Sequence, residues 1–166
     1  MSELQTGSYS YRAKRFDLYK DIIQKQFKNF LQVAETKKII FNINDPDINT
    51  IIEADEYSTN QIFLHLIDNA IKYTHKGKVE ITINRSPRNN LYVDVTDTGI
   101  GIAEEYLPML FTPFSREEQG YTRNFEGNGL GLALVKKYCE LNGADIKVSS
   151  IKGKGTTFRV TFPNHN

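Results

Sequence analysis

Four short segments contain the residue types and spacings that are suited to chemistry. In chain order they cover residues 69–73, 97–101, 127–131 and 153–157, and each combines polar side chains or glycines. A lone glycine-rich stretch is usually only a turn, but the order of the four and the kind of element that each occupies argue against coincidence. Together they predict a pocket for a magnesium nucleotide.

The first segment belongs to a predicted helix whose polar face can line a ligand. His65, Asn69, Lys72 and Tyr73 follow one another at steps of four, three and one, so they share this face. The amide oxygen of Asn69 is a hard, neutral ligand that suits Mg²⁺ beside phosphates and water. Lys72 can neutralise a phosphate, and Tyr73 offers a ring for stacking and one hydroxyl. The alternative is an ordinary solvated helix face, which is the better interpretation of Lys72 taken alone.

Asp97 lies at the end of a predicted strand and is followed by Gly99 and Gly101. An ionised carboxylate at this place can accept a hydrogen bond from the 6-amino group of adenine, whereas guanine presents a carbonyl there. The glycines lack a Cβ, so the chain can turn sharply and a flat base can approach the backbone. The alternative is an Asp-Thr-Gly turn without a ligand.

Gly127, Gly129 and Gly131 alternate just before a predicted helix and into its start. Backbone N–H groups at a helix start can point at phosphates, so the segment predicts an anion cradle. Its spacing fits neither a Walker A loop nor a dinucleotide fingerprint. The alternative is a flexible loop before a helix, and Leu130 and Leu132 also indicate close packing.

Gly153 and Gly155 form a predicted turn between two strands, and Thr156 or Thr157 then places a hydroxyl where it could reach a base. Taken alone, this pattern is more often a hairpin turn than a binding site. The interpretation as a site therefore depends on the other three segments.

A fifth stretch, residues 111–116, begins a long irregular region that we interpret as a mobile lid. Arg116 could reach the terminal phosphate when such a lid closes. The alternative is that Phe111 and Phe114 anchor the core while Arg116 is solvated.

The composition is that of one globular domain. The 166 residues are 39% hydrophobic and carry a formal net charge of +1, which provides no global field for nucleic acid or an anionic membrane. Apolar runs are far shorter than a membrane span needs, and no signal-peptide pattern is present. Cys139 is the only cysteine. We therefore expect a soluble, cytoplasmic domain, whose parent protein could be membrane-anchored.

Hydrophobic periodicity predicts helices and strands in an order that can position these segments. The predicted elements are a polar lead-in (1–15), a helix (16–36), two strands (39–43 and 48–53), a helix from the N-cap Asp55 to residue 74, a hairpin (79–83 with 91–95), a short helix (103–110), the irregular stretch (111–126), a helix (129–141) and two strands (146–151 and 156–162).

With these residues assembled, the chain resembles the catalytic ATP-binding domain of bacterial sensor histidine kinases, in the superfamily that includes gyrase B, Hsp90 and MutL. Residues 69–74 resemble the N box, and residues 97–101 and 127–132 the two glycine boxes. Residues 111–116 resemble the F box, and residues 153–158 the final Gly-x-Gly-Thr-Thr-Phe segment. The implied fold is an α/β (α+β) sandwich, with one mixed, largely antiparallel sheet covered on one face by about three helices and a mobile ATP lid.

The resemblance also implies roles for single residues. Asn69 would hold Mg²⁺, Lys72 and Arg116 would contact phosphates, Asp97 would contact the adenine amine, and Tyr73 would lie beside the base or ribose. His65, Asn69 and Arg116 form the implied catalytic set. The remaining implied ATP-binding residues are Gly99, Gly101, Ile102, Gly127, Gly129, Leu130, Gly131, Leu132, Thr156 and Thr157.

Two departures from the family pattern concern histidines. These kinases commonly have an asparagine four residues before the metal ligand, where this chain has His65, which could still hydrogen-bond a phosphate. The kinases phosphorylate a histidine in a His-Glu-x-x-x-Pro-like context, and His65, His75 and His165 all lie outside such a context. The implied partners are therefore a separate histidine-bearing dimerisation domain and a response regulator receiver domain. Residues 1–15 would be the tail of the upstream helix and a linker, and residues 16–163 the catalytic domain.

Three functions remain open at this stage. The first is transfer of the γ-phosphoryl group of Mg-ATP to that separate histidine, which asks the domain mainly for positioning and charge neutralisation. The second is a nucleotide-responsive docking module without transfer. The third is an ATPase of the gyrase or MutL type, which ranks last because His65 occupies the place of the general-base carboxylate.

Overall fold

The computed structural model describes residues 10–112 and 131–164. Within them, five strands form the main sheet in the order β2-β4-β5-β7-β6, and two form a small sheet, β1-β3. The strands are β1 (Ala13–Asp17), β2 (Ile40–Ile43), β3 (Ile51–Asp55), β4 (Lys78–Arg85), β5 (Leu91–Asp97), β6 (Asp145–Ile151) and β7 (Gly155–Phe162). The helical elements are a π-helical turn η1 (Leu18–Ile23), α2 (Gln24–Lys37), α3 (Glu56–Lys72), a 3-10 turn η2 (Glu104–Met109) and α5 (Gly131–Leu141).

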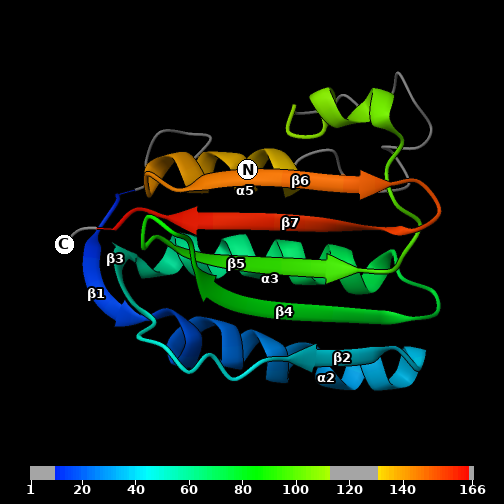
Figure 1. Cartoon of the computed structure of the whole chain (residues 1–166), viewed down its shortest axis with the longest axis horizontal. Helices are drawn as coiled ribbons and strands as arrows, with labels where there is room; N and C mark the ends of the chain where they lie inside the picture. The colour runs from blue at the N-terminus through cyan, green and yellow to red at the C-terminus, as the bar shows by residue number, and fades with distance from the viewer. Residues whose placement is uncertain (1–9, 113–130, 165–166) are drawn as a thin grey trace.

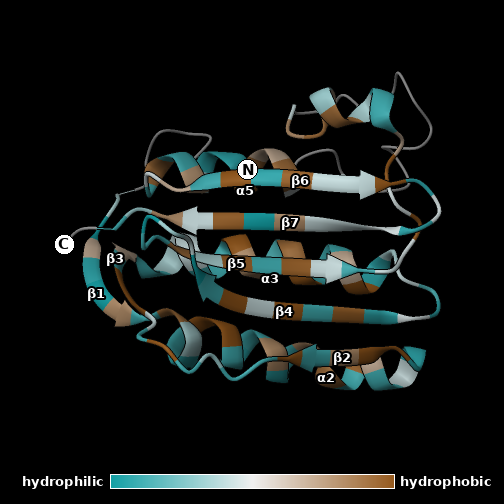
Figure 2. Ribbon diagram, viewed as in Figure 1, coloured by the Kyte–Doolittle hydropathy of each residue, from teal (hydrophilic) through white to brown (hydrophobic). Residues whose placement is uncertain are grey.

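Helices α2, α3 and α5 lie on one face of the main sheet (Figure 1). Buried and more exposed residues alternate along the strands, so that Val93 and Val95 of β5 are buried whereas Tyr92 and Asp94 are half-buried. Figure 2 shows hydrophobic and hydrophilic residues interspersed in this way along the ribbon. The core between the sheet and the helices includes the side chains of Phe63, Phe162, Ile62, Leu66, Ile67, Ile71, Ile81 and Ile83.

The predicted fold class is confirmed. Among the described strands, β2 and β4 are parallel and every other neighbouring pair is antiparallel, so the sheet is mixed and largely antiparallel. The predicted hairpin is also confirmed, because Ile81 lies opposite Val95 and Ile83 opposite Val93. Strand β7 lies between β5 and β6, so the C-terminal ends of β5 and β6 meet the start of β7 at one end of the sheet, although β5 is far from the other two in the sequence (Figure 1).

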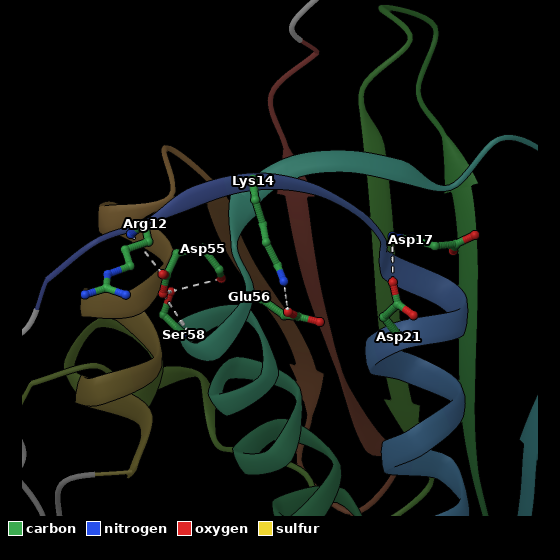
Figure 3. Close-up of polar contacts among 7 residues, drawn as sticks. All are labelled: Arg12, Lys14, Asp17, Asp21, Asp55, Glu56 and Ser58. Carbon is green, nitrogen blue, oxygen red and sulfur yellow. Dashed lines mark hydrogen bonds and ion pairs between the residues drawn. The ribbon is translucent and has the colours of Figure 1, made fainter.

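Helix α3 begins where Asp55 predicts. Its carboxylate accepts hydrogen bonds from the Ser58 backbone N–H at 3.0 Å and from the Ser58 hydroxyl at 2.6 Å, as an N-cap does. The same carboxylate accepts from the backbone N–H of Arg12 at 3.0 Å, and Lys14 forms an ion pair with Glu56 at 2.6 Å (Figure 3). These contacts tie β1 and the residue before it to the start of α3.

The predicted start of the first helix is wrong. Phe16 belongs to strand β1, and the helical part begins at Leu18, after the N-cap Asp17 accepts from the Lys20 N–H at 3.0 Å. Strand β1 also includes Ala13, within the stretch assigned to the lead-in. Its partner is the distant strand β3, so local periodicity carries no sign of the pairing.

The other predicted elements are closer to the structure. The second predicted strand, residues 48–53, is displaced, because β3 covers Ile51–Asp55. The predicted short helix is present as the 3-10 turn η2. The last helix and the last two strands are confirmed as α5, β6 and β7, although residues 129 and 130 lie outside the described residues.

Candidate functional site

The centre of the candidate site is Asp97, the last residue of β5. The residue is 8% exposed, and burial raises the pKa of its carboxyl to about 6. Hydrogen bonds from the backbone N–H groups of Gly99 and Thr156 oppose that rise, and the Gly99 bond measures 2.8 Å. Asp97 is thus a buried carboxylate with acceptor capacity left for a donor on a ligand.

The chain after β5 is fixed to the C-terminal end of α3. The backbone N–H of Ile100 donates to the carbonyl of Tyr73, the C-cap of α3, at 3.1 Å. A Cβ on Gly99 would lie 2.3 Å from that carbonyl oxygen, so only glycine fits at this approach. This packing brings the helix residues 69–73 to the same end of the molecule as Asp97.

Gly101 is required for a second backbone approach. Its φ of +70° is unfavourable for residues with a Cβ, and a Cβ there would lie 2.2 Å from the carbonyl oxygen of Ile151. We expected Gly99 and Gly101 to leave room for a base. In the structure both positions require glycine for a different reason, because the neighbouring backbone occupies the space that a side chain would need.

Asn69 is a buried amide on α3, one turn before the end of the helix. The residue is 8% exposed, and its backbone carbonyl accepts from the N–H of Tyr73 at 3.0 Å, whereas its side-chain amide has no hydrogen-bond partner among the described residues. Its carbonyl oxygen is therefore suited to the predicted role as a Mg²⁺ ligand.

The other residues predicted on the polar face of α3 differ in exposure. Lys72 is exposed, with its Nζ 4.0 Å from an Asp68 oxygen and 5.9 Å from the centroid of the Tyr73 ring. Tyr73 is buried as part of the core. His65 is half-buried, and burial lowers its pKa while the nearby Asp68 partly offsets that effect. The predicted face thus contains a solvated cation beside a buried amide and a buried ring.

The two threonines of β7, left as alternatives by the sequence, point to opposite faces. Thr156 is buried and lies directly opposite Asp97. Thr157 lies opposite Thr96, and their hydroxyls are 3.0 Å apart on the more exposed face of the sheet. The structure therefore brings Thr156, and not Thr157, to the carboxylate of Asp97.

The remaining predicted residues divide into two groups. Ile102 and Leu132 are fully buried in the core, and Gly131 is the first residue of α5. Residues 113–126 of the predicted lid lie outside the described residues, as do Gly127, Gly129 and Leu130, so Arg116 is not placed. Phe114 lies there as well, while Phe111 packs against Phe158 with ring centroids 6.3 Å apart, as the core alternative predicts.

Two polar residues that hold this end of the fold were not predicted from the sequence. Lys37 of α2 donates from Nζ to the carbonyls of Ile71 at 2.6 Å and Lys72 at 3.1 Å, which caps α3. Ser150 of β6 accepts from the backbone N–H of Ile102 at 2.7 Å. Alternation along β6 could have placed Ser150 on the inward face, but the Lys37 contact depends on how two helices pack.

Two structural criteria concern metals and membranes. Among the described residues, no group of three or more His, Cys, Asp and Glu side chains is arranged to hold a metal ion. Across the same residues, no helix combines the length and apolar character needed to cross a membrane.

The fold defines the class of the domain. It superposes on the nucleotide-free catalytic domain of the histidine kinase ThkA with a TM-score of 0.77 and 26% identity, covering 92% of this chain and 97% of that one. It also superposes on the full-length kinase ShkA in complex with AMPPNP, with a TM-score of 0.79 and 25% identity, covering 93% of this chain and 32% of that one. The chain therefore has the α/β sandwich of histidine kinase catalytic domains.

Sequence comparison establishes the family. Residues 54–166 match the family described as histidine kinase-, DNA gyrase B-, and HSP90-like ATPase, and the chain belongs to that family. It is 36% identical over 170 residues to the sensor-like histidine kinase R01002 of Rhizobium meliloti, covering 99% of this chain and 31% of that protein. It is 34% identical over 168 residues to the autoinducer 2 sensor kinase/phosphatase LuxQ of Vibrio parahaemolyticus, covering 98% of this chain and 20% of that protein. The chain thus spans less than a third of these relatives.

Proposed function

We propose that the chain binds Mg-ATP and presents its γ-phosphoryl group to a histidine on a separate dimerisation domain. The observation that carries this proposal is the buried carboxylate of Asp97, held at the end of β5 beside the C-terminal turn of α3. A buried carboxylate with free acceptor capacity suits the exocyclic amine of adenine. The family membership and the AMPPNP complex of the similar kinase ShkA support the same ligand.

The magnesium ion in this proposal is held by Asn69. A buried amide without a partner among the described residues fits a site for a hard cation. When bound, the ion would neutralise charge on the phosphates. Lys72, exposed one turn away, would contribute a second positive charge, and Arg116 of the predicted lid a third.

The domain's own contribution is to bind and orient the nucleotide. Asp97 fixes the base, Asn69 and Lys72 fix the phosphates, and the attacking nitrogen comes from the histidine of the other domain. Phosphoryl transfer requires little covalent chemistry from the protein, so positioning and charge neutralisation carry the catalysis. The further partners in this proposal are the dimerisation domain of a longer kinase and a response regulator receiver domain. We place the domain, which includes strand β1 from Ala13 onward, in the cytoplasm, and we propose that the chain before β1 links it to an upstream helix.

The decisive experiment is a calorimetric titration with a non-hydrolysable ATP analogue, with and without Mg²⁺, and with the matching GTP analogue as control. We expect adenine-selective binding that Mg²⁺ strengthens. The chain is then mixed with a histidine-bearing dimerisation domain and ATP labelled at the γ-phosphate. Label on that domain supports transfer, and binding without label favours a nucleotide-responsive docking module. The absence of any nucleotide binding would refute both functions.

Asn69→Asp tests the metal assignment separately. A carboxylate at this position adds negative charge beside the phosphates and should change the strength and Mg²⁺ dependence of ATP binding. Asn42→Asp is the matched control, because Asn42 is exposed on the edge strand β2. If Asn69→Asp binds Mg-ATP as the unmodified chain does, Asn69 is not the metal ligand.

A further inference from the structure

Three polar side chains form a row across the sheet beside the candidate site. Asp97 of β5 lies opposite Thr156 of β7, and Thr156 lies opposite Ser150 of β6. Asp97 and Thr156 are buried, and Ser150 is half-buried. Side chains of residues directly opposite on neighbouring strands point to the same face of the sheet. The three side chains therefore lie side by side, with Thr156 in the middle.

The hydroxyl oxygen of Ser150 makes three short polar contacts. It lies 2.7 Å from the backbone nitrogen of Ile102, 2.8 Å from the carbonyl oxygen of Gly155 and 2.8 Å from the hydroxyl oxygen of Thr156. These contacts join the segment after β5 to both sides of the turn between β6 and β7. Ser150 therefore links the segment after β5 to the start of β7, where Thr156 lies opposite Asp97.

The chemistry of the three partners decides which hydroxyl carries which hydrogen bond. The Ile102 N–H can only donate, and the Gly155 carbonyl can only accept. Ser150 has a single hydroxyl proton, which must go to Gly155 if the 2.8 Å contact between their oxygens is to be favourable. The contact between Ser150 and Thr156 is then a hydrogen bond only if Thr156 donates. Only this assignment makes all three contacts hydrogen bonds.

The consequence is a fixed polarity for Thr156. Its hydroxyl proton is committed to Ser150, so toward a ligand it presents lone pairs and acts as an acceptor. Its neighbour Asp97 is also an acceptor when ionised. We propose that Ser150 is a positioning residue for base selectivity, which holds the Thr156 hydroxyl as an acceptor so that the site favours an amine over a carbonyl at the purine 6-position. This inference rests on the proposed function, since it assumes that a nucleotide base meets Asp97.

The test compares ADP with IDP, which carries a carbonyl where ADP has the 6-amino group. Calorimetric titrations at pH 8, with Mg²⁺ present, give the ratio of the two dissociation constants. In Ser150→Ala the Thr156 proton is released and can turn toward the carbonyl of IDP, so we expect the preference for ADP to fall by about fivefold to tenfold. Ser150→Thr keeps a hydroxyl at this position and should restore the preference.

Controls separate selectivity from folding. Ser149→Ala makes the same change one residue away on the exposed face of β6, and it should leave the ratio unchanged. Because Ser150→Ala also leaves the Ile102 N–H without its acceptor, Thr156→Val serves as a second variant. It removes the hydroxyl itself, and it should also reduce the preference for ADP.

The outcomes are distinguishable. Equal weakening of ADP and IDP binding in Ser150→Ala would make Ser150 a purely structural residue and overturn the inference. An unchanged ratio in Thr156→Val would overturn it as well, because Thr156 would then not face the purine 6-position. If the unmodified chain binds neither nucleotide, the proposed function fails, whereas adenine-selective binding with unchanged variant ratios refutes only the role of Ser150.

Discussion

Replacing Asp97 by asparagine should stabilise the folded chain at neutral pH while weakening its binding of adenine nucleotides. Asp97 is 8% exposed, and burial raises the pKa of its carboxyl from the ordinary 3.8 to about 6. The charged form therefore costs free energy in the folded state, and a neutral amide of the same shape avoids that cost. The amide can also turn a donor toward the adenine amine, where an acceptor is needed.

The size of the effect follows from the change in pKa. A rise from 3.8 to about 6 is roughly two units, so the ionised carboxylate lowers the free energy of unfolding by up to about 3 kcal/mol. Because the folded state has the higher pKa, it binds more protons than the unfolded state between these pH values. The stability of the unmodified chain therefore falls as the pH rises through this range. The cost is absent well below pH 3.8 and complete above about pH 7.

Urea denaturation of the two proteins at pH 8 and at pH 4.5 measures this effect. We expect Asp97→Asn to raise the free energy of unfolding by about 3 kcal/mol at pH 8 and by only about 1 kcal/mol at pH 4.5. Asp47→Asn, in the exposed loop before β3, is the matched control and should change little at either pH. In calorimetry, the affinity of the unmodified chain for ADP should decrease as the pH falls below 6, and that of Asp97→Asn should be weak at every pH. A loss of stability at pH 8, or an equal gain at both pH values, would refute the reasoning.

Two further predictions concern residues outside the nucleotide contacts. Lys37→Met removes the ammonium group that caps α3 through the carbonyls of Ile71 and Lys72, and it should lower the free energy of unfolding by about 1–2 kcal/mol. The control Lys28→Met, on the exposed side of α2, should leave the free energy of unfolding unchanged. Equal effects of the two substitutions in urea denaturation would contradict the capping role. Cys139 is buried, and burial raises the pKa of its thiol to about 12. The thiol should therefore react with a disulfide reagent at pH 8 only after the chain unfolds. Rapid reaction of the folded chain would contradict this and would show that this part of α5 opens.

The features predicted correctly depend on short stretches of chain. The N-cap Asp55 and the apolar stripe of α3 are both visible within a few turns of one helix, and the structure confirms them. The β4–β5 hairpin is also local, because its strands are joined by one short loop and alternate with the same period. The positions of Asn69 and Asp97 at one end of their elements could likewise be predicted from the sequence.

Other features depend on contacts between distant segments. Strand β1 pairs with β3, and no pattern near Phe16 reveals that partner. The choice between Thr156 and Thr157 was settled by the register of β7 against β5, which determines which threonine faces Asp97. From the sequence, the missing Cβ at Gly99 was interpreted as room for a base. In the structure the Tyr73 carbonyl lies where that Cβ would be, so the backbone packing itself requires glycine.

Residue type and spacing were sufficient for the family and for most of the helices and strands, because turns, caps and periodicity are local properties of a chain. The raised pKa of Asp97, the amide of Asn69 without a partner among the described residues, and the row from Asp97 through Thr156 to Ser150 required the tertiary structure. Burial and hydrogen-bond direction depend on what lies beside a group in space. In a sheet whose order is β2-β4-β5-β7-β6, the neighbour of Asp97 on β7 comes from a strand that is distant from β5 in the chain.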